Sequence, residues 1–474
     1  MDVHLLAQPY FGQAMQFVDH GGGRNVVGPS TIGEARQRLR SGDVRLASDV
    51  RRAPRLRHAA NDTRTDVRIQ QFTATKIACG RTNVTPLPAT VGADDAECMA
   101  AATVGAAFEH KRTRLLSELE RPGQLIEHIT PNWFASVMGT GIVANAAATL
   151  PVHSAELRAF ATVVWALASF ALLALTVAFA AHWILHPANA RRYAEHPVVS
   201  LFYGAPPMAM LTVGAGTLLL GKDVIGDTAA LHIAATLWVL GTITGVATSV
   251  WMPYRMLRQG RSNALPAWLM PVVPPMVSAT GGALLLPYIG DDGLRVWLLA
   301  LCYALFALSL ALGAAAMTLI YRSLLRGGGP TLQAAPTVWI TLGLVGQSIT
   351  AANLLGADAG LVLGSAHASL ARDLHAFGIG YGLFVGVLAI GAVTVACTVT
   401  AKAMRNGLRF SLTWWSFTFP VGTCVTGATA LGAALGLGAV SVLAVVLYAA
   451  LLSAWVVVAA HTVRGSISGR IFMP

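Results

Sequence analysis

The sequence predicts an all-α integral membrane protein with ten transmembrane helices, arranged as five helical hairpins around a central pore. The first observation is composition: 55% of the 474 residues are hydrophobic, only 12% are charged, and the mean hydropathy is +0.59. Soluble domains carry about 25% charged residues, so this balance is typical of a membrane protein. The other two observations are a series of apolar segments and an uneven distribution of basic residues between them.

Residues 1–126 differ in character from the rest of the chain. They are rich in Arg, Asp, Thr and Gly and show no sustained apolar period, which predicts a disordered basic tail. Two interpretations stay open: a cytoplasmic regulatory tail, or a dispensable stretch that could lie upstream of the true start, for example at Met99. Residues 108–129 mix charged and apolar positions, so we expect a short surface helix that leads into the membrane.

Residues 127–465 are predicted to form the membrane domain, and residues 466–474 a C-terminal tail. A bilayer-spanning helix needs about 20 apolar residues, and ten segments meet that length approximately. They are expected at 131–150, 157–185, 199–221, 228–252, 266–288, 294–321, 336–357, 376–401, 411–436 and 438–462.

Basic residues mark every second loop. One set of loops, together with the C-terminal tail, holds twelve: Arg191, Arg192, Arg255, Arg258, Arg261, Arg322, Arg326, Lys402, Arg405, Arg409, Arg464 and Arg470. The opposite set holds four: Arg158, Lys222, Arg295 and Arg372. Because cytoplasmic loops of membrane proteins carry the excess of Lys and Arg, we expect a multi-pass protein of the cell membrane with both termini in the cytoplasm.

Odd-numbered segments are interrupted by glycine and proline, whereas even-numbered segments are mostly smooth apolar runs. Gly and Pro weaken a helix interior, so their recurrence in alternate segments indicates a shared role in a transmembrane path. The candidate pore-lining or kink residues are Gly139, Thr140, Gly141, Gly214, Pro275, Gly281, Gly346, Gln347, Thr418 and Pro420. Small residues also allow close helix packing in membranes, and that interpretation stays open.

The ninth segment, 411–436, suggests where such a path is obstructed. Pro420 has no N–H, so we expect a helix kink that leaves the Ser416 carbonyl without its helical partner. Phe417 and Phe419 precede the proline two positions apart and therefore lie on different faces of a helix. Bulky rings beside exposed polar backbone favour an obstructed pathway, although core aromatics at a packing kink have the same pattern.

The odd segments hold no acidic or basic residue in their middles, which argues against a carboxylate proton relay or a cation site. They offer hydroxyls, the amides of Asn145, Gln347 and Asn353, and backbone freed at proline and glycine. Such weak, dispersed donors suit the rapid passage of small anions. The sequence shows no catalytic motif, no metal-ligand spacing among its five cysteines, and no aromatic-interleaved basic run. We therefore expect no enzyme activity, no cofactor, no metal and no nucleic-acid partner.

Two motifs resemble the tellurite-resistance/dicarboxylate transporter family, which includes fungal malate permeases, fungal sulfite efflux pumps, bacterial tellurite-resistance proteins and plant slow anion channels. The motif Thr-Pro-Asn-Trp-Phe-Ala-Ser-Val-Met-Gly-Thr-Gly-Ile at 130–142 is similar to the family's opening helix. The motif Trp-Trp-Ser-Phe-Thr-Phe-Pro at 414–420 is similar to its ninth helix. The resemblance covers residues 128–465 and leaves out the long N-terminal tail.

The resemblance implies a ten-helix pore of five hairpins, assembled as a homotrimer in the lipid bilayer, with Phe419 as the gate that plugs it. It also implies transport of small inorganic or dicarboxylate anions, and the opening motif favours C4-dicarboxylate (malate) or sulfite. A tellurite-resistance-like protein and a chloride- or nitrate-type channel are the alternatives within the family. From another class, the alternative is a membrane structural or binding protein that transports nothing, with kinked helices that only pack.

Overall fold

The computed structural model describes residues 123–258 and 264–472, and these ranges fold into helices without a β-strand. The predicted all-α architecture is therefore confirmed for this part of the chain. The predicted N-terminal tail lies outside the described residues up to position 122. Most of the surface helix expected at 108–129 lies there too, and its described end is a single turn, α2 (Gln124–Glu127).

Among the residues that the structure describes, eight helical stretches are long and apolar enough to cross a membrane. They are Ala155–Leu185 (α4), Val199–Ile225, Asp227–Arg258 (α8), Asp292–Leu325 (α10), Leu332–Leu363, Ser365–Arg405, Leu412–Leu435 and Gly438–Ser468 (α14). Four of these stretches consist of several successive helical elements. Val199–Ile225 comprises η2 (Val199–Gly204), α6 (Ala205–Gly216), the π-helical turn η3 (Thr217–Gly221) and α7 (Lys222–Ile225). The other three each comprise a 3-10 turn and an α-helix: η6 (Leu332–Trp339) with α11 (Ile340–Leu363), η7 (Ser365–His367) with α12 (Ala368–Arg405), and η8 (Leu412–Phe417) with α13 (Phe419–Leu435).

The remaining two predicted segments are helical but shorter. The first comprises η1 (Pro131–Trp133) and α3 (Phe134–Thr149), and the fifth comprises η4 (Pro266–Leu269), α9 (Pro274–Leu285) and η5 (Leu286–Tyr288). Prolines at both ends of α9 explain its length, because proline starts a helix easily but cannot continue one. Two short elements lie beyond the apolar segments, α5 (Pro187–Glu195) and η9 (Arg470–Phe472).

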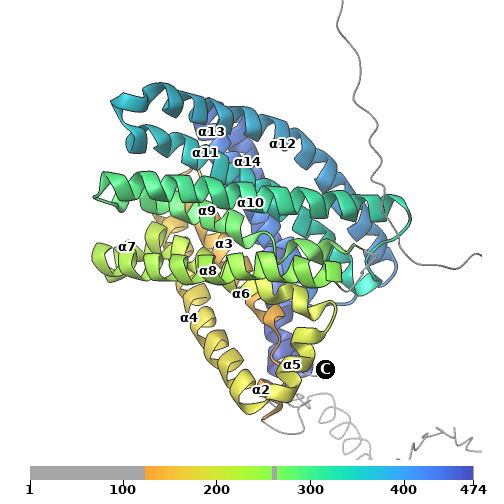
Figure 1. Cartoon of the computed structure of the whole chain (residues 1–474). Helices are drawn as coiled ribbons and strands as arrows, with labels where there is room; N and C mark the ends of the chain where they lie inside the picture. Colours follow the sequence, from red (N-terminus) through yellow and green to blue (C-terminus); the bar gives the residue numbers. More distant parts are fainter. Residues whose placement is uncertain (1–122, 259–263, 473–474) are drawn as a thin grey trace, which may run out of the picture. The chain divides into compact units, whose positions relative to one another are not determined.

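Five helices contact one another in a closed ring, in the order α3, α6, α9, α11, α13 and back to α3. Each ring helix also packs against the long helix that follows it: α3 on α4, α6 on α8, α9 on α10, α11 on α12, and α13 on α14. Figure 1 shows the long helices α8, α10 and α12 running across the bundle. The most apolar stretch of Leu332–Leu363 is 89% buried, whereas that of α4, α8, α12 and α14 is only 22% buried.

Tryptophan indoles fasten the ring to the outer helices. A buried indole N–H needs an acceptor, and here each acceptor belongs to a neighbouring helix. The N–H of Trp165, Trp455 and Trp238 on the outer helices donates to Thr217, to Thr140 and to the Ser278 carbonyl. The indoles of Trp339 and Trp415 donate outward, to Thr400 on α12 and Thr462 on α14. These bonds fix the rotation of α4, α8, α12 and α14 against the ring.

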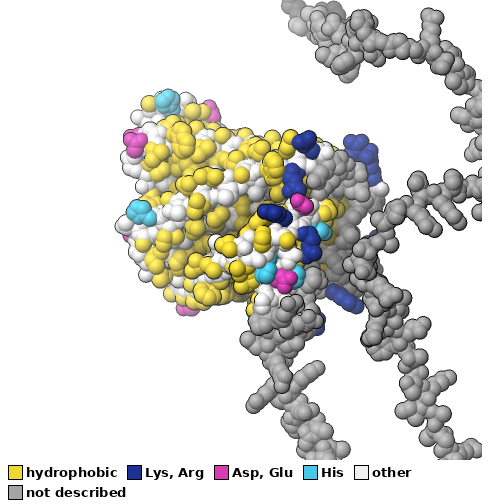
Figure 2. All heavy atoms as spheres, turned by 60° about the horizontal axis from the view of Figure 1, so that its bottom comes forward, with side chains coloured by type: hydrophobic (Ala, Val, Ile, Leu, Met, Phe, Trp, Pro, Cys, Tyr) yellow, Lys and Arg dark blue, Asp and Glu magenta, His cyan; other side chains and the backbone are white. Residues whose placement is uncertain are grey.

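Charge is divided between the two ends of the bundle. Figure 2 shows a surface rich in hydrophobic side chains, with Lys and Arg gathered at one end. His and acidic side chains are visible at both ends, whereas no Lys or Arg is visible at the other end in this view. Two ion pairs, Arg158–Asp223 and Arg295–Asp292, lie at the end away from the predicted basic loops. We name that end the acidic end and the other the basic end. The structure thus carries the charge asymmetry that the loops predict.

Pro420 does not kink a continuous α-helix, so the expected geometry of the ninth segment is wrong in this detail. Residues Leu412–Phe417 form the 3-10 helix η8, and α13 begins at Phe419 with Pro420 in its first turn. The N–H of Thr418 donates to the Trp415 carbonyl at 3.2 Å, and the N–H of Gly422 donates to Thr418 at 2.9 Å. A proline in the first helical turn removes a donor that has no intrahelical partner there, which makes this the favourable place for the break.

Candidate functional site

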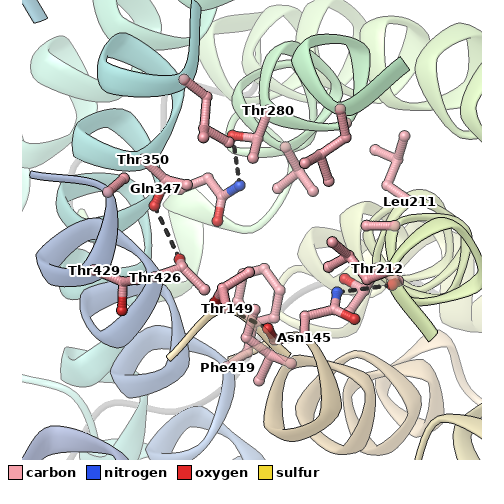
Figure 3. A pocket seen from close by; sticks show the side chains of 18 of the residues that line it. Asn145, Thr149, Leu211, Thr212, Thr280, Gln347, Thr350, Phe419, Thr426 and Thr429 are labelled. Carbon is pink, nitrogen blue, oxygen red and sulfur yellow. Dashed lines mark hydrogen bonds between the residues drawn. The ribbon is translucent and has the colours of Figure 1, made fainter. Parts of the chain in front are cut away.

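A cavity of about 280 Å³ lies inside the ring (Figure 3). All five ring helices and η3 contribute side chains to it. The lining residues are Ile142, Asn145, Thr149, Leu211, Thr212, Ala215, Leu219, Val277, Thr280, Gly281, Leu284, Gln347, Thr350, Leu354, Phe419, Thr426, Thr429, Ala430 and Ala433. This set contains hydroxyls and amides but no acidic, basic or histidine side chain.

Polar lining groups bind across the helix boundaries, as the dashed lines in Figure 3 show. Gln347 Nε2 donates to Thr280 Oγ1 at 2.8 Å and joins α11 to α9. Asn145 Nδ2 donates to the Thr212 carbonyl at 3.0 Å and joins α3 to α6. The α11–α13 boundary is joined by the Thr350 and Thr426 hydroxyls, 2.9 Å apart. These bonds join neighbouring ring helices and orient the polar groups of the cavity lining.

Two buried polar atoms of the lining have no hydrogen-bond partner, Asn145 Oδ1 and Thr429 Oγ1. An unsatisfied buried polar atom costs about 1–3 kcal/mol, so these atoms favour a polar occupant of the cavity. The Thr429 hydroxyl is a donor as well as an acceptor.

Phe419 separates this cavity from a second one. The second cavity has a volume of only about 20 Å³ and lies among the first turns of the ring helices, toward the basic end. Its lining residues are Ala135, Met138, Phe202, Met208, Met270, Val273, Ile340, Gly343, Leu412, Trp415, Ser416, Phe419 and Pro420. A space of that size holds about one water molecule. Phe419 is the residue common to both linings and is only 3% exposed, so its ring stands between the wide cavity and the narrow one.

Four of the predicted site residues lie on these cavities. Gly281, Gln347 and Phe419 line the larger cavity, and Phe419 and Pro420 line the smaller one. Phe417 lines neither cavity. Its ring packs edge-on against Trp339 and Trp414, with centroids 5.8 Å apart in both pairs. The two phenylalanines therefore face different surroundings, as their spacing predicts.

The other predicted residues do not contribute to these two linings but set helix contacts. A side chain would collide with Trp415 and Thr418 at Gly139, with Thr212 at Gly141, and with the α13 backbone at Gly346. At Gly214 it would make a tight contact with Leu237. Thr140 accepts the Trp455 indole, the buried Thr418 hydroxyl donates to the Trp415 carbonyl, and Pro275 lies in the first turn of α9. For these positions the close-packing interpretation describes the geometry.

Sequence reasoning missed the threonines that supply most of the polar lining. They are Thr149, Thr212, Thr280, Thr350, Thr426 and Thr429. A signal was present, because lining residues recur three or four positions apart on the ring helices, as with Ile142, Asn145 and Thr149 on α3. Threonine is common on apolar segments and therefore marks a site less clearly than glycine and proline, which are unusual within a helix.

Comparison with known proteins places this geometry in a family. Residues 128–463 match the SLAC1 family, described as voltage-dependent anion channel. The chain belongs to this family. The resemblance predicted from the motifs at 130–142 and 414–420 is thereby confirmed. The match begins just before α3 and ends within α14, so it covers the entire ring and all of the outer helices except the last residues of α14.

Several transporters are similar to this SLAC1-family chain over nearly their whole length. Two uncharacterized transporters of Methanocaldococcus jannaschii are each 26% identical, over 359 and 367 residues. These matches cover 73% and 76% of this chain and 97% and 99% of the relatives. The sulfite efflux pump SSU1 of Arthroderma otae is 24% identical over 353 residues, 73% of this chain and 93% of the pump. Family and relatives together support anion transport.

Proposed function

We propose that this protein conducts small anions across a membrane through the ring of five helices, with Phe419 as the gate. The observation that carries the proposal is the path itself: a neutral, hydroxyl-lined cavity and a narrow second space that meet at one aromatic ring. In this proposal all ten apolar segments cross the bilayer as five hairpins. The two shorter ones span 131–149 and 266–288 when their flanking 3-10 turns are included, which is close to the ~20 residues required.

The lining favours small anions of low charge. No carboxylate lines the cavity to repel an anion, and the hydroxyl and amide groups can replace part of its hydration shell. A C4-dicarboxylate such as malate carries two charges, and proteins usually meet each with Arg or Lys. With no such side chain in the lining, a sulfite-type anion, as hydrogensulfite, fits better than malate, and the relative named as a sulfite efflux pump supports this choice. A chloride- or nitrate-type channel has the same requirements and is the second candidate.

Flux assays with purified protein in liposomes test the function. We expect uptake of chloride, nitrate and sulfite to exceed that of malate by about tenfold or more, because an unmatched second charge in an apolar space is costly. Protein-free liposomes of the same lipid provide the control. Preferred uptake of malate would contradict the choice of anion. Absence of flux for all four anions, including in the Phe419→Ala variant, would favour the alternative of a structural or binding protein.

The assembly and placement in the membrane are part of the proposal. We propose a homotrimer in the cell membrane with both termini in the cytoplasm, so that the basic end is cytoplasmic. The outer helices support a lipid or subunit contact, since they expose side chains such as Phe170, Phe384 and Val446. The trimer follows from the family resemblance, and the orientation from the charge of the loops.

Cysteine labelling tests the orientation. Gly329 lies on an exposed loop at the basic end and Gly290 on one at the acidic end, and a new side chain meets open space at both. In a variant without the native cysteines, we expect Gly329→Cys to react with an impermeant thiol reagent only from the cytoplasm. Gly290→Cys should react only from outside. The opposite labelling pattern would reverse the proposed orientation.

A further inference from the structure

Helix α11 continues beyond the apolar segment predicted for it and carries a carboxylate, Asp358, one turn past the last cavity-lining residue of that helix. The segment was expected to end at 357, but α11 extends to Leu363 and includes Asp358. Gln347, Thr350 and Leu354 of α11 line the larger cavity. Asp358 follows Leu354 by four positions and therefore lies on the same face, one turn nearer the acidic end. It is half-buried, in a segment where an ionisable residue is costly and usually functional.

Several other charged side chains at the acidic end have an ion-pair or hydrogen-bond partner. Asp223 pairs with Arg158 and Asp292 with Arg295, while Lys222 donates to the Tyr288 hydroxyl at 2.7 Å. Asp358 has no hydrogen bond or ion pair within the described part of the chain. The elements packed against α11 carry these titratable or charged groups at this end: Tyr288 on η5, Asp292 and Arg295 on α10, His367 on η7, and Arg372, Asp373 and His375 on α12. None of these groups bonds to Asp358 within the described part of the chain.

We propose that Asp358 is a charge filter at the mouth of the cavity, which admits monovalent anions and rejects divalent ones. This inference rests on the proposed function and assigns its selectivity to one side chain. A fixed carboxylate repels an anion in proportion to the anion's charge, and this repulsion is screened less at a half-buried group such as Asp358 than in open solvent. A divalent anion therefore meets twice the electrostatic barrier of a monovalent one. The neutral donors deeper in the cavity then serve anions that have passed this filter.

The filter also makes conduction depend on pH. Protonation removes the charge of Asp358, so anion flux should rise as pH falls on the acidic-end side. The rise should be larger for a divalent anion, because its barrier is larger. Nitrate and sulfate are suitable probes, since neither changes its own protonation between about pH 5 and 8 and any change in flux reports on the protein.

The test compares the sulfate-to-nitrate flux ratio in liposomes for Asp358→Asn, in the Phe419→Ala background where the gate does not limit flux. We expect the ratio to rise about fivefold, and the pH dependence of sulfate flux to disappear. Asp358→Glu keeps the charge and should keep both properties. Asp373→Asn removes an exposed carboxylate from the same end, on α12, and should change neither. Asp358→Ser is a second neutral variant, for use if Asp358→Asn does not yield folded protein.

The outcomes separate this inference from the proposed function. If the Phe419→Ala protein conducts nitrate, but neither neutral variant changes the sulfate-to-nitrate ratio, the filter is wrong and the pore stands. Flux that is independent of pH in the Phe419→Ala protein, with Asp358 intact, overturns the filter equally. If the Phe419→Ala protein conducts no anion at all, the proposed function fails and the filter fails with it.

Discussion

Replacing Phe419 by alanine is expected to open the path and raise anion flux at least about tenfold, because lowering a barrier by only ~1.4 kcal/mol already gives that factor. Phe419 is the one residue that lines both cavities. We therefore expect removal of its ring to join them. A fully packed phenylalanine truncated to alanine costs about 3–5 kcal/mol. Phe419 borders empty space on two sides, and we expect a smaller loss of about 1–3 kcal/mol. Liposome flux and thermal unfolding in detergent measure the two effects.

Phe417→Ala is the matched control for the gate. It removes the same ring two positions earlier, from an edge-on aromatic cluster with Trp339 and Trp414. Each such aromatic pair contributes about 0.5–1.5 kcal/mol beyond burial, so we expect a loss of stability at least as large as for Phe419→Ala. Flux should stay at the wild-type level, because Phe417 lines neither cavity. If Phe417→Ala rather than Phe419→Ala releases the flux, the obstruction lies at η8 and the assignment of the gate is wrong.

Gly346→Ala is expected to destabilise the protein by about 3 kcal/mol, the upper part of the range for overpacking. A methyl group at this position would lie 2.5 Å from the Cys424 nitrogen and 2.7 Å from the Thr423 carbonyl oxygen. Both atoms belong to the α13 backbone, which cannot rotate away as a side chain can. The two helices must separate, and the nearby Thr350–Thr426 hydrogen bond across the same boundary should weaken with them. Thermal unfolding followed by tryptophan fluorescence measures the loss.

Gly360→Ala provides the comparison on the same helix. Position 360 lies in the last turn of α11 and faces open space, with no atom near an added methyl group. Alanine restricts the unfolded chain and favours helix, so stability should be unchanged or rise by up to ~1 kcal/mol. Equal destabilisation by both substitutions would show that glycine matters here for helix flexibility instead of close packing.

The sequence by itself determined the membrane class and the course of the helices. The apolar segments at 157–185 and 438–462 correspond to α4 and α14 within a few residues at their starts, because a bilayer imposes a length and composition that few other structures share. The basic loops predicted that Lys and Arg gather at one end of the bundle, and the surface shows this distribution. The motif around Phe419 and Pro420 located a break in the ninth segment, since proline restricts the backbone wherever it occurs.

Only the tertiary structure decided which side chains face the cavity. Almost every residue of a ring helix is apolar or small, so hydrophobic periodicity does not distinguish the face toward the cavity from the face toward a neighbouring helix. Gly346 and Gln347 are adjacent in sequence, yet one contacts the α13 backbone and the other lines the cavity. The distinction depends on the rotation of each helix, which is fixed by contacts between residues far apart in sequence, such as Gln347 with Thr280 and Trp455 with Thr140.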